Sequence, residues 1–197
     1  MRARTQEKLL SLGLSHAQCD VLDDYLSLVR RWNEACGLVS RRDVGRLEER
    51  HLLDSMSFLS MLDGRPRLLD IGSGGGFPGM VLALGCPEMD VVLVERSQKK
   101  ARFLQQVVYE LGIARVEVVA QDIRSYEPEN LFGTVTARAV TNPINAWSLA
   151  RPFLNRGGRF LLQTSKPISN PLDDSELCET RPGIVGWISA FEPKNPA

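Results

Sequence analysis

The feature that most constrains this chain is a run of glycines directly after a short apolar segment. Leu68-Leu69-Asp70-Ile71 predicts a buried β-strand, residues 72–76 read GSGGG, and Pro78 suits the first turn of a helix. A strand that ends in glycines and opens a helix presents bare backbone N–H groups and a positive helix dipole to a ligand. Because so many glycines are costly without a ligand, we expect residues 72–76 to form a binding loop and not merely a tight turn.

The glycine spacing separates two classes of cofactor. A dinucleotide fingerprint, G-x-G-x-x-G/A, needs a small residue at its last position, where this chain has Phe77. The pattern D-x-G-x-G-x-G, with Gly72, Gly74 and Gly76, is instead typical of S-adenosylmethionine-dependent methyltransferases. A dinucleotide-dependent oxidoreductase is therefore a distant alternative.

Strand and helix patterns alternate through the middle of the chain. Apolar runs predict strands and helical spacing predicts helices in this order: strand Asp90–Glu95, helix Ser97–Leu111, strand Val116–Ala120, strand Thr134–Ala137, helix Asn145–Leu154 and strand Gly158–Thr164. Such alternation is typical of a mostly parallel, doubly wound α/β sheet. We expect a Rossmann-like methyltransferase fold.

Polar residues follow the predicted strands where a cofactor would lie. Glu95 comes about twenty residues after the glycines, the spacing at which a carboxylate binds ribose hydroxyls. Asp122 and Ile123 follow the third strand and could meet the edge and face of an adenine. Arg138 follows the fourth. Glu95 and Arg138 could also be ordinary surface residues, and their strand-end positions favour the site reading.

The N-terminal third predicts two helices packed on this core. Ser15–Cys36 is amphipathic with Ser15 as a cap, and a second helix spans about Glu48–Leu62. Trp32 and Phe103 are expected in the core. We expect a single domain built from a helical extension (1–64), a cofactor-binding core (65–166) and a C-terminal linker and strand region (167–197), its polar linker being Pro167–Pro182.

Composition limits the partners. The 24 Lys and Arg balance the 24 Asp and Glu, so attraction to nucleic acid must come from local patches. Two patches are visible, and each could instead be a solvated surface; their members include Arg42 and Arg46, and Lys99 and Lys100. The sequence has no apolar run of about 18 residues and no signal-peptide core, which predicts a cytoplasmic protein that does not engage a membrane. The four cysteines lack C-x-x-C pairing, so we expect no metal and no disulfide framework.

Several strings together resemble one family. They are RWNEACGLVSRRD, RHLLDS at Arg50–Ser55, LLDIGSGGGFPG, RSQKKARFLQQVVYELG, and ARAV at Ala137–Val140. In order and spacing, over roughly residues 20–166, the chain resembles the bacterial 16S rRNA guanine-N7 methyltransferases, also called methyltransferase G or glucose-inhibited division protein B. The resemblance implies methyl transfer from S-adenosylmethionine to N7 of one guanine in a loop of 16S rRNA, on the small ribosomal subunit, by an enzyme expected to be a monomer.

The resemblance also implies site residues. It places the cofactor on Gly72, Phe77, the pair Ile123-Arg124, and Arg138, with Glu95 at the ribose. Arg138 could contact either the methionine carboxylate or RNA. Lys166 matches a family lysine that could touch phosphate, and it could equally be an ordinary solvated lysine. The chain departs from the family pattern at three places. Arg124 replaces an acidic residue, with Asp122 as a possible substitute, Gly37 replaces an asparagine, and the tail has lost much of its basic charge.

The chemistry implied needs no catalytic side chain. Guanine N7 carries a lone pair and no proton, so no general base is expected. His51 and Asp54, one helical turn apart, are accordingly expected to form a helix-surface hydrogen bond and not an acid–base pair. Two alternatives stay open: a Rossmann-type methyltransferase with another acceptor, and a non-catalytic rRNA-binding assembly factor.

Overall fold

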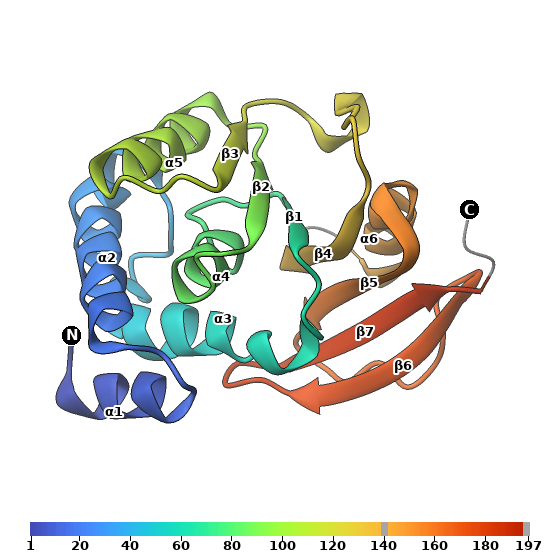
Figure 1. Ribbon diagram of the computed structural model, residues 1–197, viewed down its shortest axis with the longest axis horizontal. Helices are drawn as coiled ribbons and strands as arrows, with labels where there is room; N and C mark the ends of the chain where they lie inside the picture. Colours follow the sequence, from blue (N-terminus) through green and yellow to red (C-terminus); the bar gives the residue numbers. More distant parts are fainter. Residues whose placement is uncertain (139–141, 195–197) are drawn as a thin grey trace.

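The apolar segments form one sheet in the computed structural model, which describes residues 1–138 and 142–194 (Figure 1). The described strands are β1 (Arg67–Ile71), β2 (Asp90–Val94), β3 (Val116–Val119), β4 (Phe132–Arg138), β5 (Leu154–Thr164), β6 (Ser175–Pro182) and β7 (Trp187–Pro193). Their order is β3-β2-β1-β4-β5-β7-β6. β1 to β5 are parallel, whereas β7 is antiparallel to both of its neighbours. This confirms the mostly parallel sheet and puts the switch point between β1 and β4, where α/β proteins bind ligands.

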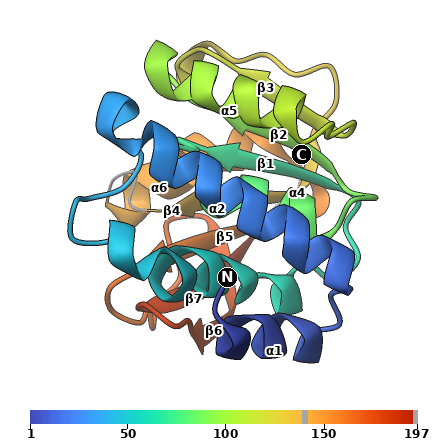
Figure 2. The ribbon, with the colours of Figure 1, turned by 90° about the vertical axis from the view of Figure 1, so that its left-hand side faces the viewer.

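Helices cover the two faces of the sheet unequally. The helical elements are α1 (Ala3–Ser11), α2 (His16–Cys36), η1 (Val44–Arg46), η2 (Glu48–Leu53), α3 (Asp54–Met56), η3 (Leu59–Met61), α4 (Gly79–Gly85), α5 (Gln98–Glu110), η4 (Ile123–Ser125), α6 (Pro143–Ala150) and η5 (Arg151–Phe153). α1 to α5 share one apolar core with the sheet, and α6 and η5 belong to a second core on the opposite face. Figure 2 looks onto the first face, with α2 in front of the sheet, α5 above it and α1 below.

The first predicted helix is confirmed in detail. Ser15 caps α2 by accepting from Gln18 N, and the Gln18 side chain returns the bond in a capping box. Phe103 is fully buried, while Trp32 is partly buried and packs 6.3 Å from the Phe103 ring.

The continuous helix expected at Glu48–Leu62 is wrong. The segment forms a π-helical turn (η2), a single α-turn (α3) and a 3₁₀ turn (η3). All five residues of 52–56 are buried, so no regular helix could direct them to one face. Tertiary packing here overrides local propensity.

Two expectations near the C-terminus are also wrong. The helix predicted to end at Leu154 ends at Ala150, because Pro152 interrupts it, and Leu154 instead opens β5. The predicted linker Pro167–Pro182 contains β6. This edge strand is mostly polar and only partly buried, so its sequence lacks the apolar alternation by which strands are recognised.

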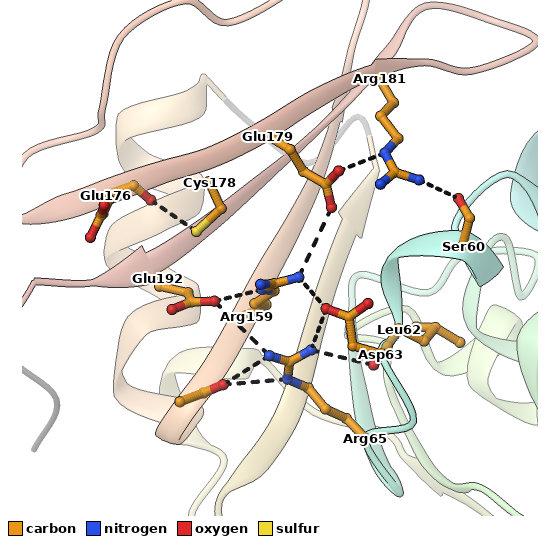
Figure 3. A network of polar contacts seen from close by, with 11 residues as sticks. Ser60, Leu62, Asp63, Arg65, Arg159, Glu176, Cys178, Glu179, Arg181 and Glu192 are labelled. Carbon is orange, nitrogen blue, oxygen red and sulfur yellow. Dashed lines mark hydrogen bonds and ion pairs between the residues drawn. The ribbon is translucent and has the colours of Figure 1, made fainter.

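A network of charged side chains ties the β6–β7 hairpin to the rest of the sheet (Figure 3). Arg159 of β5 forms ion pairs with Asp63, Glu179 and Glu192, which come from the loop before β1, from β6 and from β7. Arg65 also pairs with Asp63 and donates to the carbonyl oxygen of residue 157. Three segments distant in sequence thus meet at one arginine.

No helix in the described part of the chain is long and apolar enough to cross a bilayer. No three His, Cys, Asp or Glu side chains of residues 1–138 and 142–194 are grouped so as to hold a metal ion. Cys19, Cys36, Cys86 and Cys178 are all free thiols.

Candidate active site

The glycine segment 72–78 joins the carboxyl end of β1 to α4 and lies against the end of β2. Gly72 N donates to Val94 O at 2.9 Å. Gly72, Gly74 and Gly76 have φ values of 69°, 58° and 93°, a region that favours glycine. A side chain at Gly74 would meet only the carbonyl oxygen of Gly72, at 3.8 Å, so the outer side of this loop is open to a ligand.

The inner side of the loop is closed by Tyr25 of α2. Its hydroxyl donates to Gly75 O at 2.5 Å, and the ring is fully buried. A side chain at Gly76 would lie 2.7 Å from that hydroxyl oxygen and 2.7 Å from Met80 Cβ. Packing therefore requires glycine at position 76. The sequence placed Tyr25 only on an apolar helix face and gave no signal of its contact with the loop.

Phe77 packs its ring between the glycine loop and the neighbouring helical elements. Its side chain is 7% exposed, and its ring centroid lies 5.5 Å from that of Tyr25 and 4.9 Å from that of His51. The ring therefore joins α2, η2 and the loop in one aromatic cluster. A direct contact between Phe77 and a cofactor stays a prediction.

Asp70 anchors the loop at the strand end. Its Oδ2 accepts from Gly79 N at 3.2 Å, and its Oδ1 accepts from Thr136 Oγ1 at 2.8 Å. Burial raises the pKa of this carboxyl to about 6, although the hydrogen bonds from Thr136, Gly79 and Ser73 oppose the rise. Asp70 therefore links β1, α4 and β4 and fixes the backbone at both ends of the glycine loop.

Glu95 lies where the sequence predicted a ribose contact. It follows β2, is 7% exposed, and accepts from Gly74 N at 2.8 Å and from Ser97 N at 2.7 Å. These bonds hold the carboxylate beside the open side of the glycine loop. Each carboxylate oxygen can accept more than one hydrogen bond, so capacity remains for ribose hydroxyls. A ribose contact of Glu95 stays a prediction.

The residues after β3 form a small polar turn. Asp122 caps η4 by accepting from Arg124 N at 3.0 Å, and it accepts from the Arg124 guanidinium at 2.9 and 2.7 Å. These bonds hold the pKa of Asp122 well below its usual range. Ile123 is partly buried against the second core. The Arg124 side chain thus turns back onto Asp122, so its charge is paired within the turn.

At the ends of β4 and β5, a second group of polar residues surrounds Asp54. Arg138 and Gln163 are register partners on these strands. Asp54 Oδ2 lies 3.4 Å from Arg138 Nη2 and accepts from Gln163 Nε2 at 2.7 Å, while its Oδ1 accepts from Val185 N at 2.7 Å. Asp54 is fully buried. A single carboxylate therefore fixes two strand ends and the β6–β7 turn.

The expected surface hydrogen bond at His51 and Asp54 is consequently wrong. The Asp54 carboxylate points into the protein and bonds to residues far along the chain, which helical spacing cannot reveal. His51 Nε2 is buried without a hydrogen-bond partner among the described residues, 3.9 Å from Asp43 Oδ2. Burial and the nearby Arg138 charge lower the pKa of His51 to about 4, so its imidazole is neutral at neutral pH.

A cavity of about 790 Å³ opens beside this second group. Its lining includes Arg138 and Gln163, together with Lys166, Pro143 and Ile168. Of the predicted RNA-contacting residues, the structure therefore brings Lys166 to a cavity wall. The other four, Arg42, Arg46, Lys99 and Lys100, lie outside this wall on η1, its preceding turn and the start of α5. Their contact with RNA stays a prediction.

Comparisons with known proteins show the family of this chain. The GidB family, described as rRNA small subunit methyltransferase G, matches residues 18–181. The chain is 41% identical to the ribosomal RNA small subunit methyltransferase G of Nitrosococcus oceani, over 94% of this chain and 85% of that protein. It is 40% identical to that of Alkalilimnicola ehrlichii, over 95% and 93% of the two chains.

A solved structure shares the fold at low sequence identity. A mutant of MtNAS in complex with S-adenosylmethionine superposes with a TM-score of 0.60, at 17% identity, over 90% of this chain and 77% of that one. The likeness at this identity concerns the fold, which is that of Rossmann-like methyltransferases. On the family match and the two close relatives, this chain belongs to the rRNA small subunit methyltransferase G family.

Proposed function

We propose that this chain transfers the methyl group of S-adenosylmethionine to N7 of a guanine in a loop of 16S rRNA. Membership of the family makes the chain an S-adenosylmethionine-dependent rRNA methyltransferase of the small subunit. The observation that supports the proposal is a site in two parts, both at the carboxyl ends of the parallel strands. An open glycine loop beside Glu95 lies at the ends of β1 and β2, and a separate cavity lies at the ends of β4 and β5.

The first part of the site would hold the cofactor. The backbone of Gly72, Gly74 and Gly76 would face the methionine end, Glu95 the ribose, and the Asp122–Arg124 turn the adenine, with Phe77 beneath the loop. Arg138 keeps Nη1 buried without a partner among the described residues, which suits it to the methionine carboxylate. When bound, S-adenosylmethionine supplies a methyl group activated by the sulfonium charge.

The chain's contribution to the chemistry is positioning. N7 has a free lone pair, so no proton has to be removed, and neutral His51 is not needed as a base. Rigid placement of the acceptor beside the methyl group can lower the barrier by several kcal/mol. The buried hydrogen bonds of Asp54 and Asp70 supply that rigidity.

N7 also limits the form of the substrate. It lies on the edge of guanine that faces the major groove, and this groove is deep and narrow in an RNA helix. The acceptor must therefore be unpaired or splayed out, as in a ribosomal loop. We expect the enzyme to act as a monomer in the cytoplasm, where its ribosomal substrate is, and to be poorly active on duplex RNA.

Mapping the modified base tests the proposal directly. Purified protein is incubated with labelled S-adenosylmethionine and with 30S subunits or free 16S rRNA from cells that lack the endogenous enzyme. Borohydride–aniline cleavage then locates N7-methylguanine, and we expect one cleavage in a loop. Cofactor binding without any methylation of RNA would overturn the proposal and favour another acceptor or a non-catalytic assembly factor.

A further inference from the structure

The side-chain oxygen of Gln163 is buried and accepts no hydrogen bond from any described residue. The side chain is 7% exposed. Its Nε2 donates to Asp54 Oδ2 and to Val185 O, both at 2.7 Å. Both partners are acceptors here, so the amide nitrogen must face them and the orientation of the group is fixed. Gln163 Oε1 is left buried with no partner among residues 1–138 and 142–194.

The position of Gln163 relates it to the two-part site. Gln163 is the register partner of Arg138, one strand further from the glycine loop. It lines the cavity of about 790 Å³. The cofactor part ends at Arg138 in the proposed function, so Gln163 belongs to the part left for the acceptor. The apolar side chains of Pro143 and Ile168 in the same lining offer surfaces against which a flat base can pack.

We propose that Gln163 determines the choice of guanine, its Oε1 accepting a hydrogen bond from guanine N1–H. This inference rests on the proposed function. An acceptor locked in this orientation favours guanine, whose N1 carries a proton, and opposes adenine, whose N1 is itself an acceptor. The bond uses the Watson–Crick edge of the base, to which N7 does not belong, so N7 stays free for methylation.

Asp54 and the β6–β7 turn position the Gln163 side chain. Asp54 and Val185 O occupy both amide hydrogens of Gln163, so the amide cannot turn over to offer a donor instead. The turn is pressed onto β5, since a side chain at Gly186 would overlap the carbonyl oxygen of Thr164. An unpaired buried polar group is costly, and a site built around one discriminates strongly against a substrate that does not pair with it.

A modified substrate tests the inference on the unaltered enzyme. The acceptor guanosine, located by the cleavage mapping, is replaced with 1-methylguanosine by splinted ligation of 16S rRNA. This replacement removes N1–H and keeps N7. We expect kcat/KM for methylation to fall at least tenfold. Equal rates on guanosine and 1-methylguanosine would overturn the inference.

A variant tests the residue itself. Gln163→Met removes Oε1 and keeps most of the side-chain volume, and its rate is measured on rRNA with guanosine or adenosine at the acceptor position. We expect the guanosine-to-adenosine ratio of kcat/KM to fall at least tenfold relative to wild type. Cofactor affinity should change less than threefold, because Gln163 lies outside the cofactor part. An unchanged ratio would overturn the role of Gln163.

Lys166→Met is the matched control, because it alters the same cavity wall without touching Gln163. Lys166→Met should lower kcat/KM equally on the guanosine and adenosine rRNAs, so the guanosine-to-adenosine ratio should not change. If this ratio fell as it does in Gln163→Met, discrimination would belong to the cavity in general. The proposed function fails separately: it fails if wild-type protein methylates no rRNA, whereas this inference fails if wild type is active and indifferent to N1–H.

Discussion

The two parts of the site differ in how their polar groups are satisfied. In the cofactor part, Glu95 accepts from Ser97 N of its own loop and from Gly74 N of the glycine loop, and Asp122 accepts from Arg124 N within one turn. In the acceptor part, Gln163 Oε1 is buried without a partner among the described residues, although Asp54 and Val185 O hold the amide nitrogen of the same side chain. The first part is held by contacts within one strand–helix–strand unit and the short turn after β3, whereas the second is held by residues far apart in sequence and keeps a buried acceptor unused.

The difference indicates a division of labour. A cofactor that is common to many methyltransferases needs an accessible backbone and a few carboxylate contacts, which short local motifs can supply. Recognition of one base instead needs donors and acceptors held in fixed orientations. The acceptor part obtains that rigidity from long-range contacts. Four predictions test this contrast, beginning with the largest effect.

Gly72→Asp should abolish measurable cofactor binding. The new carboxylate would face the methionine end, and we expect affinity to fall at least about a thousandfold, or about 4 kcal/mol. Position 72 has a φ of 69°, where aspartate is tolerated better than most residues, so the fold should persist with a modest loss of stability. Calorimetric titration with S-adenosylmethionine measures the affinity.

Gly72→Ala is the control, since it introduces the backbone strain without the charge. It should bind the cofactor much more tightly than Gly72→Asp does. If Gly72→Asp keeps wild-type affinity, the assignment of the cofactor part to this loop is wrong.

The contrast also explains what the sequence could predict. Gly72 and Glu95 lie in one strand–helix–strand unit, so a local pattern and a known spacing were enough to place them. Tyr25 and Gly75 are fifty residues apart, and Asp54 and Gln163 are 109 apart. No periodicity relates such pairs, because only tertiary packing brings them together. Helical spacing therefore predicts Asp54 at a helix surface, and it predicts nothing about the oxygen of Gln163.

Asp54→Asn should cause the largest loss of stability. The amide can accept at one oxygen only, so it would present a donor to Gln163 or Val185 and leave Arg138 without its counter-ion. Breaking a buried charged contact in this way costs about 3 to 4 kcal/mol. Urea unfolding at neutral pH measures the effect. Ser57→Ala, in the same segment, removes a single local bond to a backbone carbonyl and should be nearly neutral. Similar losses in both variants would contradict the role assigned to Asp54.

Two titratable side chains near the site, His51 and Asp70, should also respond oppositely to acid. His51 has a folded-state pKa of about 4, below its ordinary 6.5, so the unfolded chain binds more protons and stability rises with pH between these values. Asp70 has a folded-state pKa of about 6, above its ordinary 3.8, so its contribution is largest below pH 4 and is lost as pH rises to 6. Each effect amounts to about 2 to 3 kcal/mol.

Single variants separate these opposing effects. His51→Phe keeps a ring against Phe77 and keeps the titration of Asp70, but it removes the contribution of His51 that rises with pH. Its stability relative to wild type should therefore fall as pH rises from 4.5 to 6.5. Asp70→Asn leaves His51, so its relative stability should rise over the same range. Urea unfolding at the two pH values gives both differences. Curves parallel to wild type in both variants would contradict the assigned titrations.

The smallest effect should come from the charged network at Arg159, remote from both parts of the site (Figure 3). Arg159→Met keeps the apolar stem but removes the ion pairs with Asp63, Glu179 and Glu192. Partly exposed ion pairs contribute little, so we expect a loss of about 1 kcal/mol that shrinks in 1 M salt, with cofactor affinity unchanged. Arg115→Met removes one exposed pair with Asp90 and should have no measurable effect. If Arg159→Met instead weakened cofactor binding, the β6–β7 hairpin would be coupled to the cofactor part, and the two parts would not be as independent as their hydrogen bonding indicates.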